Sequence, residues 1–192
     1  MGRAKLFLSA TLVVAGLVAA SQSRAVNTNA DWKPTFGPPG ADAPGSEVRA
    51  FIIYDQKLIV GGAFVQMGGN LNNNIAAWDG AQWTAVGAAG TPGLNGSVKA
   101  LAVDGTYLYA GGVFTSADGS SASKVAKWSG SAWSALGSGI GGGDVSALAV
   151  YGGDLYAGGN FTTAGGSGIS NIAKWNGSSW SALDTGLNGP VY

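Results

Sequence analysis

The sequence predicts an all-β protein built from a repeated unit of about fifty residues. Three observations support this prediction. A pattern of a double glycine, a phenylalanine and two tryptophans occurs three times, and its equivalent positions lie 50 and then 47 residues apart. The 192 residues include 34 glycines, which permit the positive φ angles of tight turns. Only 10% of the residues are charged, and the segments between the glycines are rich in strand-forming side chains.

The first 25 residues have the features of a secretory signal peptide. Arg3 and Lys5 form a positive start, residues 6–20 are weakly polar to apolar, and small residues follow, so that cleavage after Ala20 or Ala25 fits. The alternative is a membrane anchor, for which the stretch is slightly short. We therefore expect residues 1–25 to be removed, no membrane insertion of the mature chain, and a secreted, extracellular or cell-surface location.

Residues 26–47 contain one segment that resembles the last strand of a unit. Trp32, Phe36 and Gly37 repeat the pattern of Trp133, Leu136 and Gly137, and nothing like three earlier strands precedes them. This pattern predicts an orphan outer strand at the N-terminal side of the repeats.

The three units span residues 48–97, 98–144 and 145–190, and each divides into four short strand-like segments. A tight turn such as Asp79-Gly80 joins the third segment to the fourth. Residues 191–192 begin a fourth copy. The expected strands are 48–53, 58–60, 75–78 and 83–86 in the first unit, 98–103, 107–110, 125–128 and 133–136 in the second, and 145–150, 155–157, 172–175 and 180–183 in the third.

Four consecutive hairpin-linked strands in a unit of this length describe one blade of a β-propeller. The fold class predicted is therefore a β-propeller with four-stranded antiparallel blades, of which about three complete blades are present. Closed propellers need at least four blades. We expect this chain to be a fragment of a longer propeller, so that ring closure needs further sequence, or else a subunit that completes its ring by oligomerisation.

The repeat resembles the kelch repeat of the kelch-like and galactose-oxidase-like propellers. The resemblance covers residues 48–183 and rests on the double glycine that ends one strand and the tryptophan across the later turn. It departs from the usual pattern at Trp78, Trp128 and Trp175, where tyrosine is more common, and in a spacing of five residues instead of six to the next tryptophan. Similar repeats occur in large secreted bacterial proteins and in fungal cell-surface polarity proteins, which implies fold and location more than mechanism.

Histidine and cysteine are absent from the sequence, which excludes disulfides, imidazole or thiolate metal sites, and histidine- or cysteine-based nucleophiles. The galactose oxidases hold copper with such residues, so no residue of that site carries over. Paired carboxylates are the remaining acid–base option, but acids such as Asp79 and Asp104 lie in Asp-Gly turns. We expect no enzyme activity, no catalytic residue, no cofactor and no metal; without a basic patch, we expect no nucleic-acid partner.

The loops between the second and third strands differ in sequence between the units, and such loops commonly carry binding. The ligand-binding candidates are Asn70, Asn72, Asn73 and Asn74, whose amides could contact a sugar or a weakly held cation; the alternative is an ordinary polar turn. The repeated tryptophans favour packing between blades over sugar stacking. The sequence thus predicts a scaffold that binds an unknown protein or glycan, or alternatively the carbohydrate-recognition part of an enzyme whose catalytic residues lie outside this chain.

Overall fold

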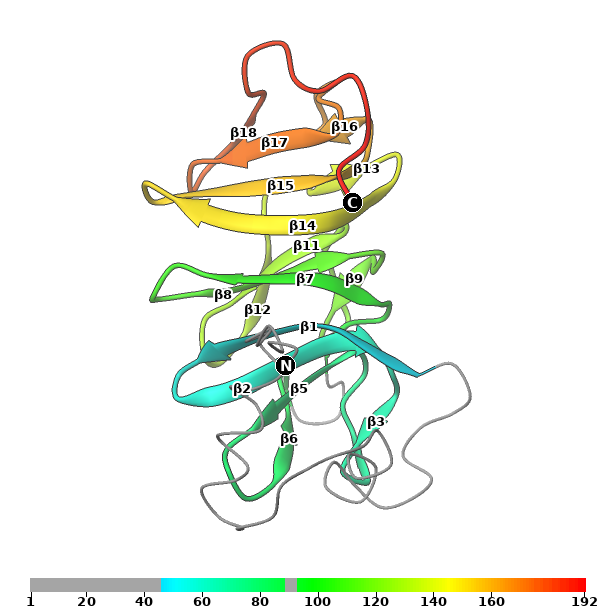
Figure 1. Cartoon of the computed structure of the whole chain (residues 1–192), viewed down its shortest axis with the longest axis vertical. Helices are drawn as coiled ribbons and strands as arrows, with labels where there is room; N and C mark the ends of the chain where they lie inside the picture. The colour runs from blue at the N-terminus through cyan, green and yellow to red at the C-terminus, as the bar shows by residue number, and fades with distance from the viewer. Residues whose placement is uncertain (1–45, 89–92) are drawn as a thin grey trace, which may run out of the picture.

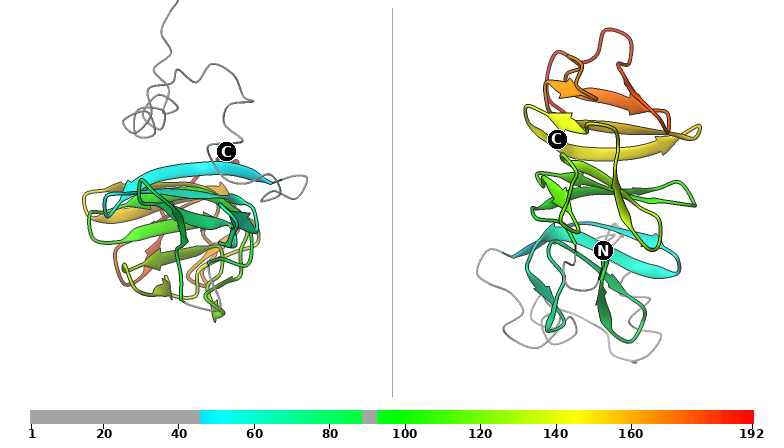
Figure 2. Two further views of the ribbon diagram at one scale, coloured as in Figure 1. Left: turned by 90° about the horizontal axis from the view of Figure 1, so that it is seen from below. Right: turned by 180° about the vertical axis from the view of Figure 1, so that it is seen from behind.

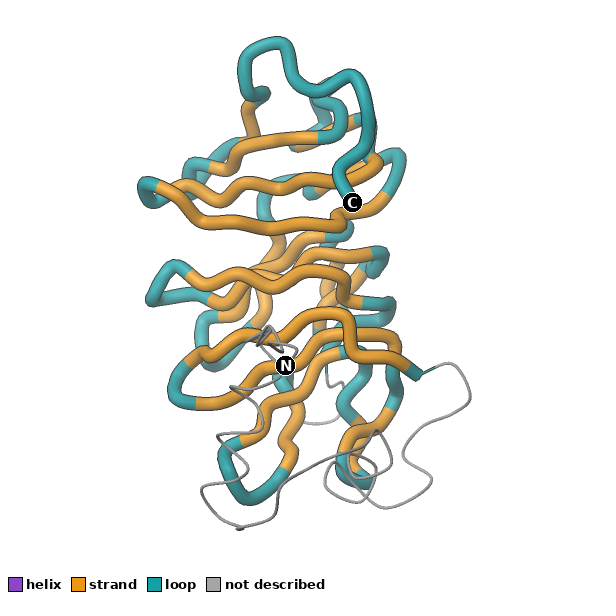
Figure 3. The backbone as a smooth tube through the Cα atoms, in the orientation of Figure 1, coloured by secondary structure: helices purple, strands orange, loops and turns teal. Residues whose placement is uncertain are grey.

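The computed structural model describes residues 46–88 and 93–192, which form an all-β structure with no helix (Figure 3). The expected signal peptide and the expected orphan strand around Trp32, Phe36 and Gly37 lie outside the described residues.

The described residues form three four-stranded antiparallel sheets, and each sheet is made by one of the predicted units (Figure 1). In every sheet the strands lie side by side in chain order. The strands are β1 (Glu47–Tyr54), β2 (Lys57–Ala63), β5 (Ile75–Trp78) and β6 (Trp83–Ala85) in the first sheet, β7 (Val98–Val103), β8 (Leu108–Gly112), β11 (Val125–Trp128) and β12 (Trp133–Ala135) in the second, and β14 (Asp144–Tyr151), β15 (Asp154–Asn160), β17 (Ile172–Trp175) and β18 (Trp180–Ser181) in the third.

The twelve strands predicted within the three units are all present, but the fourth strand of each sheet ends earlier than expected. β6 and β12 stop one residue before Val86 and Leu136, and β18 stops at Ser181. The physical reason is visible at Val86 and Leu136: both side chains are buried, and both carbonyls accept a hydrogen bond from a tryptophan of the next sheet. Val86 and Leu136 therefore contribute to the contact between sheets and lie outside the hydrogen-bond ladder of their own sheet.

Three short two-stranded ladders were not expected from the sequence. Two are hairpins within the loops between the second and third strands, and the third joins a crossover to such a loop. They are β3 (Gln66–Met67) with β4 (Asn70–Leu71), β9 (Ser116–Ala117) with β10 (Ser120–Ser121), and β13 (Ile140–Gly141) with β16 (Thr163–Ala164). Strands of two residues carry no periodic pattern, which is why the sequence did not reveal them.

The first and second strands of each sheet are joined by a two-residue turn. Asp55-Gln56 and Gly152-Gly153 both have positive φ at each residue, as type I′ hairpin turns require. The turn at Gly105-Thr106 has positive φ at Gly105. The strand pairing on either side of these turns makes Gln56 the equivalent of Thr106.

The three sheets stack face to face along the long axis of the molecule, with β1, β7 and β14 next to one another (Figures 1 and 2). One apolar cluster fills the contact between the first and second sheets around Ile59, Leu108 and Trp133. A second fills the contact between the second and third sheets around Val125 and Trp180. Each of these two contacts draws on both of its sheets, as expected for stacked repeats. A third buried cluster, around Leu58, Val60 and Trp83, consists of residues of the first unit alone.

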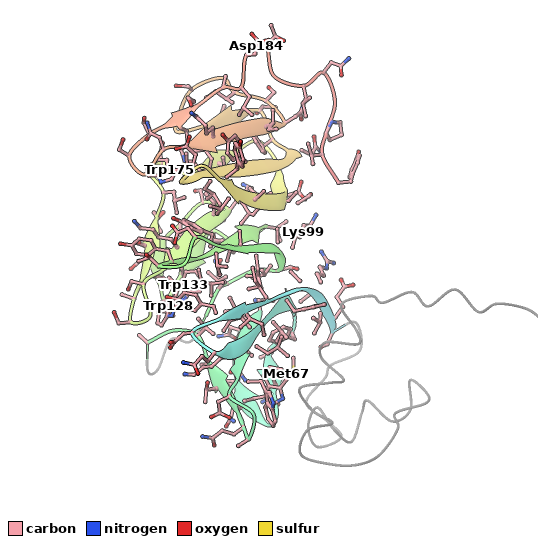
Figure 4. All side chains as sticks on the ribbon, turned by 60° about the vertical axis from the view of Figure 1, so that its left-hand side comes forward. Met67, Lys99, Trp128, Trp133, Trp175 and Asp184 are labelled. Atoms are coloured by element: carbon pink, nitrogen blue, oxygen red, sulfur yellow. The ribbon has the colours of Figure 1, made fainter. Side chains whose placement is uncertain are left out.

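The double glycines allow this close stacking. A Cβ placed on Gly61 would lie 2.5 Å from Cγ1 of Val98 in the second sheet, and one on Gly111 would lie 2.5 Å from Cγ1 of Val145 in the third. The second glycine of the pair faces its own sheet: a Cβ on Gly62 would overlap the carbonyl of Glu47. The first glycine of each pair thus permits close approach between sheets, and the second permits close approach within its own sheet. An ion pair between Lys99 and Asp144 also joins the second sheet to the third (Figure 4).

Candidate functional site

The loops that carry the binding candidates gather along one side of the stack, where the second strands end. In each sheet the loop after the second strand and the crossover to the next sheet leave from the same end, because neighbouring strands are antiparallel. Contacts join these segments: the crossover residue Leu94 forms a bridge with Ala117, and the Gly165 N–H donates to the Gly139 carbonyl at 2.9 Å. The loops and crossovers on this side thus form a connected surface on the three sheets.

Asn72, one of the four candidates, is fully buried and holds its own loop together. Its Nδ2 donates to the carbonyl of Met67 at 3.0 Å and to the carbonyl of Asn70 at 2.7 Å, which closes the β3–β4 hairpin. The equivalent position in the second sheet is Ala122, also buried. Because the Asn72 side chain is buried, an external ligand does not reach it, and its hydrogen bonds stabilise the loop from inside.

Asn74 and Asn73 connect this loop to the crossover. Asn74 has a φ of 68°, its Oδ1 accepts the N–H of Phe64 at 3.3 Å, and its Nδ2 donates to the carbonyl of Leu94 at 2.7 Å. The Asn73 carbonyl accepts the Leu94 N–H at 3.0 Å. Asn171 repeats the Asn74 bond in the third sheet, to the carbonyl of Leu187 at 3.0 Å. Asparagine suits this position because it tolerates the left-handed region.

Asn70 is the candidate that lies on the surface. Its Nδ2 donates to the carbonyl of Trp83 at 3.2 Å, and the side chain is exposed beside the exposed Leu71. Val65, which the sequence did not single out, is exposed in the same loop, and its carbonyl accepts the N–H of Asn72 at 2.9 Å. We call Val65, Asn70 and Leu71 the hairpin surface. It combines one amide with two aliphatic side chains, a mixture that suits contact with a protein or a glycan.

Asp118 anchors the crossover between the first and second sheets. One carboxylate oxygen accepts the N–H of Ala88 at 2.8 Å, and the other accepts the N–H of Gly93 at 3.1 Å. The sequence shows Asp118 only as part of an Asp-Gly turn, and its partners lie 25 and 30 residues away. No local signal in the sequence could have identified this role.

The six tryptophans of the repeats pack against one another and between the sheets. The ring centroids are 5.3 Å apart in Trp78–Trp83 and 5.5 Å apart in Trp128–Trp133 and Trp175–Trp180. The indole N–H of Trp133 donates to the carbonyl of Val86 in the preceding sheet at 2.9 Å (Figure 4). The rings of Trp133 and Trp180 are buried in the contacts between sheets, as predicted for the repeated tryptophans. The ring of Trp83 is also buried, but in a cluster of first-unit residues.

The charged groups on the opposite side of the stack, at the turns between first and second strands, serve those turns. Burial opposes ionisation of Asp104, but the N–H groups of Tyr107 and Thr106 and the hydroxyl of Tyr109 together lower its pKa below the usual value. Burial, and then the hydrogen bond to Asp104, raise the pKa of Tyr109. The Lys127 ammonium lies 4.4 Å from the ring centroid of Tyr107. This arrangement stabilises a hairpin turn and presents no nucleophile.

Within 46–88 and 93–192, no three acidic or metal-ligating side chains gather where they could hold a metal ion. In the same ranges, no helix is long and apolar enough to cross a membrane.

The sequence matches no family model and no curated protein. The resemblance to the kelch-like propellers therefore stays a prediction.

Proposed function

We propose that this chain is part of a secreted or cell-surface β-propeller of the kelch-like type, and that it serves as a passive scaffold that binds a protein or a glycan. The propeller is supported by three sheets with the same strand order, stacked through the same face-to-face contact. The location is supported by the sequence of residues 1–25. The ring is completed by further sheets, which come from sequence outside this chain or from other copies.

The observation that carries the binding role is the hairpin surface. The three loops differ in sequence, while the sheets beneath them repeat. For example, the exposed Asn70 and Leu71 occupy the positions that Ser120 and Ser121 occupy in the second sheet. Buried bonds from Asn72 fix the loop before a ligand arrives. A loop held in this way loses little entropy on binding, which lowers the cost of association.

Glycan-array binding and affinity capture with residues 26–192 test this proposal. We expect Asn70→Ala combined with Leu71→Ser to abolish binding, because both side chains are exposed at the centre of the surface. Ser120→Ala is the matched control, since Ser120 occupies the equivalent position in the β9–β10 hairpin. Unchanged binding by the double variant, with circular dichroism showing an intact fold, would refute the assignment. Binding to a sugar favours the carbohydrate-recognition alternative, and binding to a protein favours the scaffold.

A further inference from the structure

The first sheet is buried on the face that points away from the second sheet, which we call its outward face. Leu58, Val60 and Trp83 on this face are 4%, 5% and 5% exposed, and they belong to the cluster of first-unit residues. Ile59 lies between Leu58 and Val60 on β2 and belongs to the cluster shared with the second sheet. Because successive side chains of a strand point to opposite faces, the second sheet does not cover Leu58 and Val60.

The residues of the outward face correspond to those that receive the preceding sheet in the other two units. The six members of the first-unit cluster are Leu58, Val60, Phe64, Met67, Ala76 and Trp83, equivalent to Leu108, Ala110, Phe114, Ala117, Ala126 and Trp133 in the second unit. In the second unit all six pack with residues of the first unit, among them Ile59 and Val86. The outward face is thus one half of a repeated contact, and the repeat predicts that an earlier part of the chain supplies the other half.

A hydrogen bond that occurs twice in this contact identifies the residue to expect there. The indole N–H of Trp133 donates to the carbonyl of Val86 at 2.9 Å, and that of Trp180 donates to the carbonyl of Leu136 at 2.9 Å. Both acceptors are buried aliphatic residues that precede a glycine and follow the last strand of the preceding unit. Trp83 occupies the position of Trp133 in the first unit. Its equivalent acceptor therefore lies before a glycine, after the last-strand pattern that precedes the first unit.

Phe36 meets these conditions. It precedes a glycine, as Val86 does, and it ends the segment that resembles the last strand of a unit. From Phe36 to Val48 on β1 the chain advances 12 residues, the same spacing as from Val86 to the equivalent Val98 on β7. The equivalent spacing across the second crossover is 9 residues. The chain between Phe36 and β1 is therefore as long as a crossover between neighbouring sheets.

We propose that residues 32–37, which lie outside the described residues, pack along the outward face of the first sheet. The Phe36 side chain completes the apolar cluster around Trp83, as Val86 packs with the equivalent residues of the second unit. The Phe36 carbonyl accepts the indole N–H of Trp83, in the bond that the second and third units repeat. The segment before the repeats thus becomes part of the folded core.

The exposure of β1 supports a cover made by one narrow segment. Phe51 and Ile53 point to the outward face, because their partners on β2 belong to the first-unit cluster. They are 42% and 47% exposed. Their equivalents on β7, Leu101 and Val103, are half-buried because a whole sheet packs over them. A segment as short as residues 32–37, lying over the outer strands, leaves the β1 side of the face open to solvent.

Hydrogen exchange of the indole N–H groups, followed by NMR on residues 26–192, tests the proposal. Trp133 is the internal reference, because its acceptor, the carbonyl of Val86, stays in place in every variant. Phe36→Ser should quicken exchange at Trp83 about tenfold relative to Trp133, since water then reaches the bond. Thr35→Ala is the matched control and should leave this ratio unchanged, because neighbouring side chains of an extended segment point to opposite faces.

Two further variants keep the test decisive if Phe36→Ser folds poorly. Phe36→Leu, which matches Leu136, should keep the exchange ratio within about twofold of the parent. Phe36→Ala should lower the urea midpoint by about 1 M and raise the exchange ratio, because it removes the packing of the ring. An exchange ratio and a urea midpoint that stay at the parent values in Phe36→Ala would overturn the proposal. The ligand-binding role would survive that result, because it depends on the hairpin surface and not on this contact.

Discussion

Adding one methyl group to the first glycine of a pair tests the physical basis of the stacking. In Gly111→Ala the new Cβ would lie 2.5 Å from Cγ1 of Val145 and 3.2 Å from Cδ1 of Leu148. Val145 is fully buried, and its contact faces a neighbouring sheet, so relief requires the two sheets to separate. Overpacking of this kind costs about 1–3 kcal/mol, and the lower entropy of the unfolded alanine chain returns about 0.5 kcal/mol. We expect the free energy of unfolding to fall by about 0.5–2.5 kcal/mol.

A double-mutant cycle combines Gly111→Ala with Val145→Ala, which removes the clashing methyl group. Alone it should cost about 2 kcal/mol, because it leaves a cavity against Gly111. In the double variant the alanine at position 111 fills part of that cavity and meets no Cγ1. The combined loss should therefore be smaller than the sum of the single losses by about 1 kcal/mol.

Urea unfolding followed by tryptophan fluorescence measures these differences at a constant slope. Gly168→Ala is the matched control, because a Cβ at Gly168 meets no atom within 4 Å and its φ is not positive. The control should stay within about 0.5 kcal/mol of the parent. Additive losses in the cycle, or a Gly111→Ala variant as mild as the control, would refute the view that the glycine pair exists to let neighbouring sheets approach.

Three further predictions follow from the contacts between and within sheets. Trp133→Phe removes the indole N–H bonded to the buried Val86 carbonyl, and should lower the free energy of unfolding by about 1–3 kcal/mol in the same urea assay. The raised pKa of Tyr109 means that the folded state holds the phenol proton more tightly than the unfolded state does. The stability that this proton contributes is complete below about pH 10 and is lost as the pH rises further. Alkaline unfolding curves should show that Tyr109→Phe removes this pH dependence. Asp118→Ala frees two amide N–H groups, and hydrogen exchange at Gly93 should quicken about tenfold, while an unchanged rate would contradict the anchoring role.

Much of the sheet framework could be predicted from the sequence because its signals are local and repeated. The tryptophans, the glycine pairs and the turns recur at fixed offsets, and the turns also act locally, as at Gly80 between β5 and β6. The four asparagines show where this reasoning ends. Their polar pattern marks a loop, but whether a side chain is buried, as in Asn72, or exposed, as in Asn70, depends on how the loop folds onto the sheet below.

The repeated pattern of glycines and tryptophans was enough to predict an all-β chain of three like units and the strands of each. Equivalent residues of different units nevertheless differ in burial and hydrogen bonding, and this difference is visible only in the folded chain. Tyr54 and Tyr151 hold the same position in their units, yet one bonds to a neighbouring turn and the other is open to solvent. Asp118 likewise became an anchor only when chain segments far apart in sequence met. The physical reason is that burial and hydrogen bonding depend on which residues of a neighbouring sheet lie opposite. The sequence of one unit does not show those contacts.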